Sequence, residues 1–378
     1  MAGNPLENEI RDRIAAHGSM TLRRFMELCL SHPEHGYYTT RDPFGRAGDF
    51  ITAPEVSQMF GELIGLWAAA VWRQMGEPDN VRLVELGPGR GTMMHDVLRA
   101  ARVVPAFHAA IVAHLIEISP VLRSRQRRTL AGMDVPLWWH DSFSEVPAGP
   151  MIVLANEFFD ALPVAQAVKA PGGWHERTIE IADEGHFELG YMSQPMALFE
   201  RFLPAELADA PDGTVYEWRD DTLALEIGRR LYHERGAGLV IDYGYTEPGI
   251  GETLQAVSGH DYVEPYADPG QADITAHVDF RALGRSCEGM GLRLHGPVTQ
   301  SDFLMSLGIS RRAEALRASM PQRSEEIDAA VARLVRGGRT GMGSLFKVLG
   351  FAHPSLGELP GFEGASEEAG IAEDEAES

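Results

Sequence analysis

The sequence is poor in cysteine, in lysine and in long apolar runs. Cys29 and Cys287 are its only cysteines and lie far apart, which excludes a disulfide framework and a cysteine-ligated metal site. No HExxH or EF-hand pattern occurs, so no bound metal is expected. The longest nearly apolar run, 63–72, is too short to span a bilayer, which predicts no membrane insertion. Because the first residues also lack an apolar signal core, we expect a cytoplasmic protein.

Basic residues are also scarce compared with acidic ones. Among 378 residues, 33 are Lys or Arg and 55 are Asp or Glu, which gives a net charge of −22. Residues 354–378 contain eight acidic residues and no basic one, so about −14 remains for the rest of the chain. Such a balance disfavours nucleic acid as a partner, because phosphates require a basic surface. The acidic segment has few bulky apolar residues and is expected to be disordered.

The hydrophobic pattern divides the chain into successive parts. From residue 81 short strands alternate with helices, which predicts an α/β fold with a doubly wound, mostly parallel sheet. A helical stretch with a glycine-marked loop precedes this core and is interpreted as a cap or lid. The expected parts are the N-terminal cap (1–80), the core (81–298) with an inserted hairpin at about 174–191, a helical insertion (299–337) that would shape a substrate site, the last core strand (338–353) and the acidic tail (354–378).

One helix start within the cap has a specific signature. The run Thr52-Ala-Pro-Glu55 matches a capping box, in which the first and last side chains satisfy each other's backbone amides. Apolar residues follow at helical spacing as far as Gly76. The pattern therefore predicts a single helix that begins after Thr52 and ends at Gly76.

A glycine-rich turn follows the first strand of the core directly. The strand 81–86 contains Glu85, and the helix after the turn begins at Thr92. The glycines of the turn are Gly87, Gly89 and Gly91. Glycine lets the backbone turn sharply and approach a ligand, and a helix N-terminus favours its anionic or polar groups. A dinucleotide site would need GxGxxG. The GxGxG spacing is instead similar to motif I of class I S-adenosylmethionine-dependent methyltransferases.

Acidic residues end the next two strands of the core. Glu117 ends the second strand, 30 residues after Gly87, where a carboxylate can accept hydrogen bonds from both ribose hydroxyls of an adenosine. Asp141 and Ser142 follow the third strand, where a carboxylate can accept from the adenine amine. Each carboxylate could instead be an ordinary solvated residue at a strand end.

The fourth strand leads into the run Asn156-Glu-Phe-Phe-Asp-Ala-Leu-Pro163. Ligands of doubly wound sheets bind outside the carboxyl ends of the strands. Asn156, Glu157 and Asp160 are therefore expected to face the reactive end of the cofactor. Asp160 could alternatively cap the turn that follows it.

Taken together, these motifs resemble the MidA-type methyltransferases, whose mitochondrial members assist the assembly of respiratory complex I. The similarity runs from about residue 10 to residue 351. Its further matching segments are 48–55, 240–244, 273–280 and 342–347. The resemblance implies a class I methyltransferase fold with S-adenosyl-L-methionine as cofactor. It also implies that Phe50 and Thr52 cap the cofactor.

The same resemblance implies methylation of an arginine on a protein such as a respiratory-complex subunit. A guanidinium is protonated at neutral pH and is a poor nucleophile. Glu157 and Asp160 could localise its charge on two nitrogens and aim the third at the methyl group. The in-line displacement of a sulfide then depends on positioning and needs no metal. Two alternatives stay open, namely a small-molecule methyltransferase with a pocket closed by 299–337 and an assembly chaperone that binds the cofactor with little catalysis.

Overall fold

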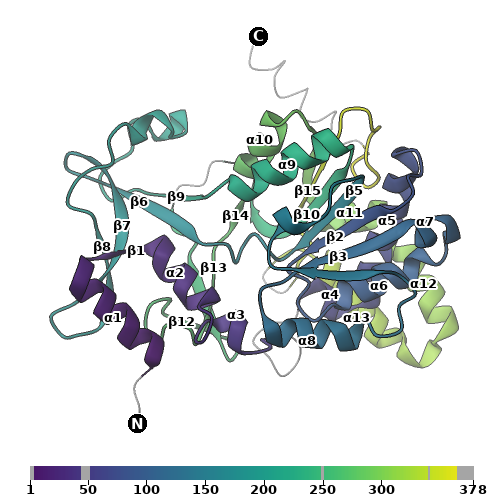
Figure 1. Ribbon diagram of the computed structural model, residues 1–378, viewed down its shortest axis with the longest axis horizontal. Coiled ribbons are helices and arrows are strands. Elements are labelled where there is room, and N and C mark those ends of the chain that lie inside the picture. Colours follow the sequence, from purple (N-terminus) through teal and green to yellow (C-terminus); the bar gives the residue numbers. More distant parts are fainter. Residues whose placement is uncertain (1–3, 44–51, 248–250, 339–340, 364–378) are drawn as a thin grey trace. The chain divides into compact units, whose positions relative to one another are not determined.

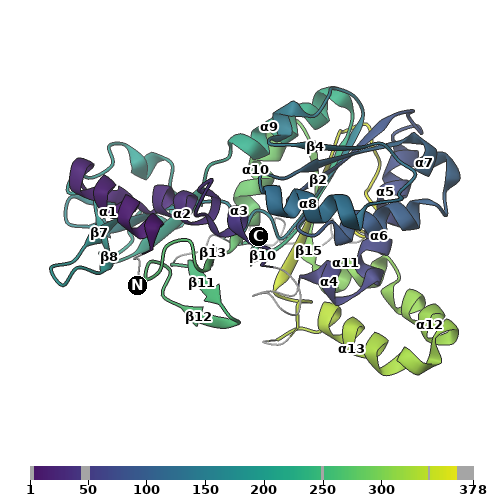
Figure 2. The ribbon, with the colours of Figure 1, turned by 60° about the horizontal axis from the view of Figure 1, so that its bottom comes forward.

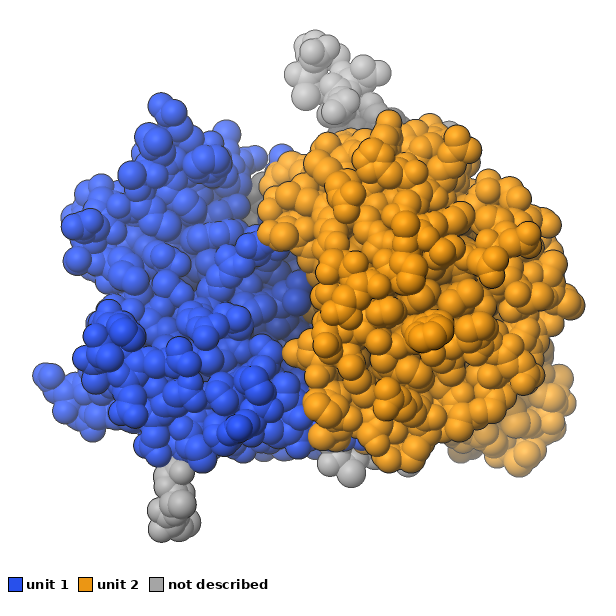
Figure 3. All heavy atoms as spheres, viewed as in Figure 1, with its two compact units in different colours: residues 1–50, 160–220, 245–281 blue, residues 51–159, 221–244, 282–378 orange. Residues whose placement is uncertain are grey.

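The computed structural model describes residues 4–43, 52–247, 251–338 and 341–363. The chain divides into two compact units (Figures 1 and 3). Unit 1 comprises residues 1–50, 160–220 and 245–281, and unit 2 comprises residues 51–159, 221–244 and 282–378. This division differs from the expected one, because residues 52–80 belong with the sheet rather than with a separate cap. Residues 160–220 and 245–281, expected within the core, form unit 1 with the N-terminal helices.

Unit 2 contains the predicted doubly wound sheet. Its strands run in the order β15-β16-β10-β5-β2-β3-β4. Neighbours from β10 to β4 pair in parallel, and β16 is antiparallel to both β10 and β15. The strands are β2 (Val81–Leu86), β3 (Ile111–Ile116), β4 (Leu137–His140), β5 (Met151–Asn156), β10 (Ala237–Tyr245), β15 (Arg293–Thr299) and β16 (Phe346–Ala352). β5 is buried along its whole length, as expected for a strand covered on both faces.

Helices cover both faces of this sheet. Figures 1 and 2 show α9 on one face and α5, α6 and α8 on the other. The packing of α5 on α6 depends on small residues, since a Cβ at Gly61 would lie 2.7 Å from Asp96 Cβ. The helices are α5 (Gln58–Gln74), α6 (Thr92–Ala101), α7 (Pro105–Ala110), α8 (Pro120–Thr129), α9 (Thr222–Glu234) and α10 (Phe280–Gly289). The helical insertion is present as α11 (Gln300–Ser306), α12 (Ile309–Ser319) and α13 (Ser324–Val335).

The predicted capping box at Thr52 is wrong. A short helix α4 (Ala53–Val56) is separated from α5 by Ser57, whose backbone is extended. The Thr52 side chain makes no capping hydrogen bond, whereas Ser57 caps α5 by accepting from Met59 N at 3.2 Å. Glu55 bonds to a residue of α6 instead. The local pattern failed because a long-range partner satisfies this carboxylate.

Unit 1 is built on an antiparallel sheet in the order β1-β7-β6-β9, with β8 also paired to β7. The predicted hairpin is present as β7 and β8, but β6 and β9 were not predicted. The strands of unit 1 are β1 (Met20–Thr21), β6 (Val164–Ala170), β7 (Gly173–Ile181), β8 (Phe187–Tyr191), β9 (Val215–Arg219), β11 (Gln255–Ser258), β12 (Asp261–Val263), β13 (Asp273–Thr275) and β14 (Val278–Asp279). Its helices are α1 (Pro5–His17), α2 (Leu22–Ser31) and α3 (Tyr37–Thr40).

The segment that follows β16 is ordered further than expected. Leu356, Leu359 and Phe362 are buried in the core of unit 2, and Trp67 Nε1 donates a hydrogen bond of 3.1 Å to Pro360 O. The expectation of disorder from residue 354 is therefore wrong as far as residue 363, because these apolar side chains have a hydrophobic surface to cover. The rest of the acidic tail, 364–378, lies outside the described residues. Among the described helices, none has the length and apolar character needed to cross a membrane.

Candidate cofactor and active site

The glycine turn between β2 and α6 has the backbone geometry that its sequence predicts. Gly87, Gly89 and Gly91 all have left-handed backbones, with φ of 59°, 53° and 80°. Other residues adopt such angles only at a cost. A Cβ at Gly87 would lie 2.7 Å from Phe158 Cδ2, so the turn is also packed closely against the loop that follows β5.

Glu85, the acidic residue of β2, is buried beneath this turn. Its side chain is 2% exposed, and Oε2 makes no hydrogen bond to any described residue. Burial raises the pKa of the Glu85 carboxyl to about 8, although a hydrogen bond from the Met94 backbone opposes the rise. A buried acceptor without a partner is costly, so this oxygen is suited to a donor group supplied by a ligand.

Glu117, at the end of β3, is held by hydrogen bonds to both carboxylate oxygens. Oε1 accepts from Ser119 N at 2.8 Å, and Oε2 accepts from Gln126 Nε2 at 3.0 Å. Burial raises the pKa of the Glu117 carboxyl to about 7, against the effect of these donors. The same Gln126 Nε2 donates to Gly89 O at 2.8 Å. The glycine turn and the Glu117 carboxylate are therefore joined through one side chain.

Gln126 was not predicted from the sequence, because it lies among the arginines of α8. Gln126 is nevertheless completely buried, as is Leu122 one turn earlier. Trp139 Nε1 donates to Gln126 Oε1 at 2.8 Å. The spacing of four residues between Leu122 and Gln126 marks the inner face of the helix and could have identified this glutamine.

Asp141 and Ser142, after β4, lie at the surface. The Asp141 side chain is 71% exposed and pairs with Arg123 Nη2 at 2.5 Å. Arg123 Nε also donates to Glu117 O at 2.6 Å, so this arginine links the ends of β3 and β4. Ser142 Oγ lies 2.7 Å from Ser144 Oγ. The arrangement places Asp141 near Glu117 while leaving its carboxylate accessible.

Asn156 is the last residue of β5, and Glu157 follows it directly. Glu157 has a left-handed backbone, with φ of 49°, and its N–H donates to Ile241 O at 2.9 Å. Glu157 Oε1 accepts from Ala53 N at 3.0 Å and from Asn156 Nδ2 at 3.1 Å. Asn156 Oδ1 is buried without a hydrogen bond to the described residues. Positive φ at a residue other than glycine costs about 1–3 kcal/mol and is concentrated at functional sites.

A second residue that the sequence reasoning did not select organises the loop after β5. Asp242, in β10, is completely buried. Its Oδ2 accepts from Phe158 N at 3.2 Å and from Phe159 N at 3.0 Å. Its Oδ1 accepts from Tyr243 N at 2.9 Å. An acidic residue inside the apolar run that forms β10 was the available signal, since a buried charge in a strand needs partners.

The segment expected to cap the cofactor is described from Thr52 onward, and Phe50 lies outside the described residues. Thr52 O accepts the amides of Glu55 and Val56, which begins α4. Through Ala53 and Glu55 the segment bonds to Glu157 and to α6. The predicted cofactor residues from Thr52 to Asn156 thus all belong to unit 2.

Asp160 belongs to unit 1, whereas Glu157 belongs to unit 2. Asp160 is 6% exposed, and its backbone oxygen accepts from Ala276 N and from Arg219 Nη2, each at 3.1 Å. Arg219 also donates to the carbonyl oxygens of Leu162, Ala276 and His277, at 3.2, 2.6 and 2.7 Å. The chain turns from Asp160 directly into β6, so no helix follows for this residue to cap.

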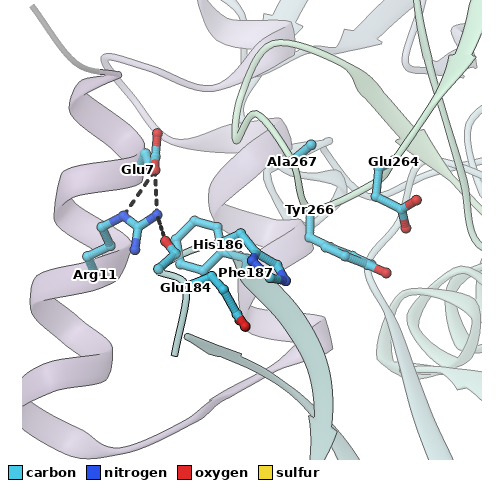
Figure 4. Close-up of a pocket in the computed structure, with 9 residues that line it drawn as sticks. Glu7, Arg11, Glu184, His186, Phe187, Glu264, Tyr266 and Ala267 are labelled. Carbon is cyan, nitrogen blue, oxygen red and sulfur yellow. Dashed lines mark hydrogen bonds and ion pairs between the residues drawn. The ribbon is translucent and has the colours of Figure 1, made fainter. Parts of the chain in front are cut away.

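Unit 1 also contains a cavity of about 400 Å³, shown in Figure 4. Arg11 lies over the ring of Phe187, with 4.6 Å from Cζ to the ring centroid, and donates to Glu7 and to Gly185 O. Other lining residues are Glu184, His186, Glu264, Tyr266 and Ala267. None of the predicted site residues lines this cavity.

The chain is similar to known methyltransferases over most of its length. A family model described as “Putative S-adenosyl-L-methionine-dependent methyltransferase” matches residues 63–298. The mitochondrial protein arginine methyltransferase NDUFAF7 of Homo sapiens is 35% identical over 338 residues, which cover 82% of this chain and 75% of that protein. The NDUFAF7 homolog of Drosophila melanogaster is 34% identical over 375 residues, covering 91% of this chain and 84% of that protein.

A solved structure with a similar fold contains S-adenosyl-homocysteine, the form of the cofactor that remains after methyl transfer. It is a protein of Burkholderia thailandensis bound to S-adenosyl-homocysteine. It aligns with a TM-score of 0.82 and 31% sequence identity, covering 95% of this chain and 94% of that chain.

Proposed function

The chain belongs to this family of S-adenosyl-L-methionine-dependent methyltransferases, and we propose that it transfers the methyl group to an arginine side chain of a protein. S-adenosyl-L-methionine is its cofactor. Support for the arginine comes from the curated relatives, which are named protein arginine methyltransferases. A subunit of a respiratory complex is the class of substrate that we propose.

The observation that carries the proposal is the fixed carboxylate of Glu157. This residue directly follows β5, a central parallel strand, and ligands of such sheets bind outside the carboxyl ends of the strands. Ala53 N and Asn156 Nδ2 hold its Oε1, and its backbone is in a conformation that only a constrained site retains. A positioned carboxylate binds a guanidinium through short, charge-assisted hydrogen bonds. Charge localised in this way would leave another nitrogen of the guanidinium free to attack the methyl group.

We assign Asp160 as the second carboxylate of the substrate site. Asp160 follows Glu157 by three residues in the sequence. Asp160 is buried and its backbone is fixed by Arg219 and Ala276. A second acidic group would accept from the guanidinium edge that Glu157 leaves unpaired.

For the cofactor, we assign the residues that end successive strands of unit 2. Glu117 would accept from the ribose hydroxyls, and Asp141 with Ser142 would lie at the adenine. Glu85, whose buried Oε2 makes no hydrogen bond to the described residues, would accept from the cofactor's amino group. The remaining assigned contacts are those of Gly87, Gly89, Gly91, Thr52, Asn156 and Phe50. The assignment follows the rule that ligands bind outside the carboxyl ends of parallel strands.

The test is a search for the methylated product. Purified protein is incubated with S-adenosyl-L-methionine carrying a deuterated methyl group and with an extract of cells that lack this gene. We expect the label on arginine in peptide digests analysed by mass spectrometry. Label confined to small molecules would overturn the protein substrate and support the metabolite alternative.

A variant separates catalysis from a chaperone role. Gly89→Val places a branched side chain on a left-handed backbone and should abolish cofactor binding. If the folded variant still supported assembly of the respiratory complex in cells, methyl transfer would be dispensable and the proposal would fail.

A further inference from the structure

We infer that Gln126 is a positioning residue of the cofactor site, which locks the glycine turn and the Glu117 carboxylate into one rigid group. The inference rests on the assignment of Glu117 to the ribose. It does not depend on which substrate accepts the methyl group.

The contacts of Gln126 join three separate parts of unit 2. Its Nε2 donates to Gly89 O at 2.8 Å and to Glu117 Oε2 at 3.0 Å. Its Oε1 accepts from Trp139 Nε1, in β4, at 2.8 Å. The side chain is completely buried, so water does not compete for these bonds.

The indole fixes the direction of the amide. An indole N–H only donates, so it must face the oxygen of Gln126 and not its amino group. The amide therefore cannot flip, and both hydrogens of Nε2 are directed away from Trp139. One hydrogen reaches the carbonyl of Gly89 and the other reaches Glu117. The carbonyl of Gly89 and the carboxylate of Glu117 are thereby held in a fixed position relative to each other.

This bridge leaves Glu117 oriented for a ligand. Ser119 N donates one hydrogen bond to Oε1, and Gln126 Nε2 donates one to Oε2. A carboxylate has about four acceptor positions, so these donors leave a further position for a ribose hydroxyl. Arg123 is the charged group whose proximity favours the ionised form of this carboxyl, together with donors at Ser119, Gln126 and Ile118. Loss of Gln126 removes one of these donors and frees the carboxylate to rotate.

The experiment compares two ligands in two proteins. Isothermal titration calorimetry measures S-adenosyl-homocysteine and its 2′,3′-dideoxy analogue with the full chain and with Gln126→Met. Methionine keeps the length of the side chain but removes its hydrogen bonds. We expect the variant to bind S-adenosyl-homocysteine about 10-fold more weakly or worse, and to bind the analogue within about 3-fold of the unsubstituted protein. We also expect the pH below which S-adenosyl-homocysteine binding weakens to move upward in the variant.

Gln300→Met is the matched control. Gln300 is equally buried, and its Nε2 donates to Leu334 O within the helical insertion. We expect this substitution to leave the affinities for both ligands unchanged. Trp139→Phe is the second variant if Gln126→Met does not fold, because it removes the donor that orients the amide and keeps an aromatic ring at this position. It should weaken S-adenosyl-homocysteine about 3-fold or more, again without affecting the analogue.

Equal losses of affinity for the two ligands in Gln126→Met would overturn the inference. Such a result would indicate a general disturbance of the fold, because the analogue lacks the ribose hydroxyls. Unchanged binding of both would overturn it as well. If the unsubstituted protein bound the analogue as tightly as S-adenosyl-homocysteine, the ribose assignment of Glu117 would fail. Absence of arginine methylation would contradict the proposed substrate but would not change what the binding measurements say about Gln126.

Discussion

The hydroxyl of Thr92 donates a hydrogen bond of 2.5 Å to Glu55 Oε1. Thr92 is the first residue of α6, directly after the glycine turn, and Glu55 belongs to α4. A carboxylate near a helix N-terminus is also favoured by the helix dipole. The bond therefore attaches the segment that begins at Thr52 to the end of the helix where the cofactor is expected to bind.

Removal of this hydroxyl should weaken the cofactor site. Thr92→Val keeps the shape of the side chain but deletes the donor to Glu55. A hydrogen bond to a charged group contributes about 1.5–3 kcal/mol. We expect a lower thermal midpoint and a loss of S-adenosyl-homocysteine affinity of about 3- to 10-fold, measured by calorimetry. A lower midpoint with unchanged affinity would mean that the bond stabilises unit 2 but does not shape the site.

Neutralising Glu157 should remove its charge without changing the structure of the loop that contains it. In Glu157→Gln the amide oxygen can still accept from Ala53 N, so the fold of this loop should persist. The charge that would bind the guanidinium is lost. Removal of one preorganised electrostatic contact typically lowers rates about 10²–10³-fold. We expect such a loss in the deuterated-methyl assay, with S-adenosyl-homocysteine affinity within about 3-fold of the unsubstituted protein. Full activity of this variant would exclude Glu157 from substrate binding.

Arg219 should be required for the position of Asp160. Its guanidinium donates to backbone oxygens of both the Asp160 loop and the segment at Ala276. Lysine is a point charge without the planar fork, so Arg219→Lys cannot reproduce this set of bonds. We expect methyl transfer to fall about 10-fold, equivalent to about 1.4 kcal/mol, with cofactor affinity unchanged.

Hydrogen–deuterium exchange checks the cause of that loss. The Ala276 amide donates to Asp160 O at 3.1 Å and should exchange faster in Arg219→Lys. Faster exchange without a loss of transfer would assign Arg219 to the stability of unit 1 alone. A loss of transfer with unchanged exchange would show that the arginine acts in another way.

Local patterns predicted the parts of the fold that local interactions determine. The strand 81–86, the glycine turn and the helix from Thr92 were all confirmed, because a buried strand, left-handed glycines and a helix start are encoded by adjacent residues. Ser119 likewise caps α8 by accepting from Leu122 N, and a serine directly before a proline is a local signal of a helix start.

Features that depend on distant partners were not predictable in this way. The capping box at Thr52 failed because Glu55 bonds across the fold to Thr92. The order of residues 354–363 depends on a surface to which Trp67 contributes, and that surface exists only after folding. Gln126 and Asp242 were missed for a related reason, since a buried polar residue is recognised by its partners and these lie far away in the sequence.

Glu85 should make the stability of unit 2 depend on pH. Burial raises the pKa of its carboxyl to about 8, whereas an unfolded chain has the ordinary value near 4.5. Below that value the group is protonated in both states and carries no penalty. Between the two values the folded state binds more protons, so the free energy of unfolding decreases as pH rises. Above about pH 8 the buried carboxylate is ionised at its full cost.

Glu85→Gln removes this titration while it keeps the size of the side chain. Without cofactor, we expect the variant and the unsubstituted protein to have similar urea midpoints at pH 5. At pH 8.5 the variant should be the more stable one, by on the order of a few kcal/mol. The titration of other groups does not affect this comparison, because both proteins contain those groups. A difference that did not change with pH would contradict a raised pKa. S-adenosyl-homocysteine should reduce the difference at pH 8.5, because its amino group would pair with the ionised carboxylate in the unsubstituted protein alone.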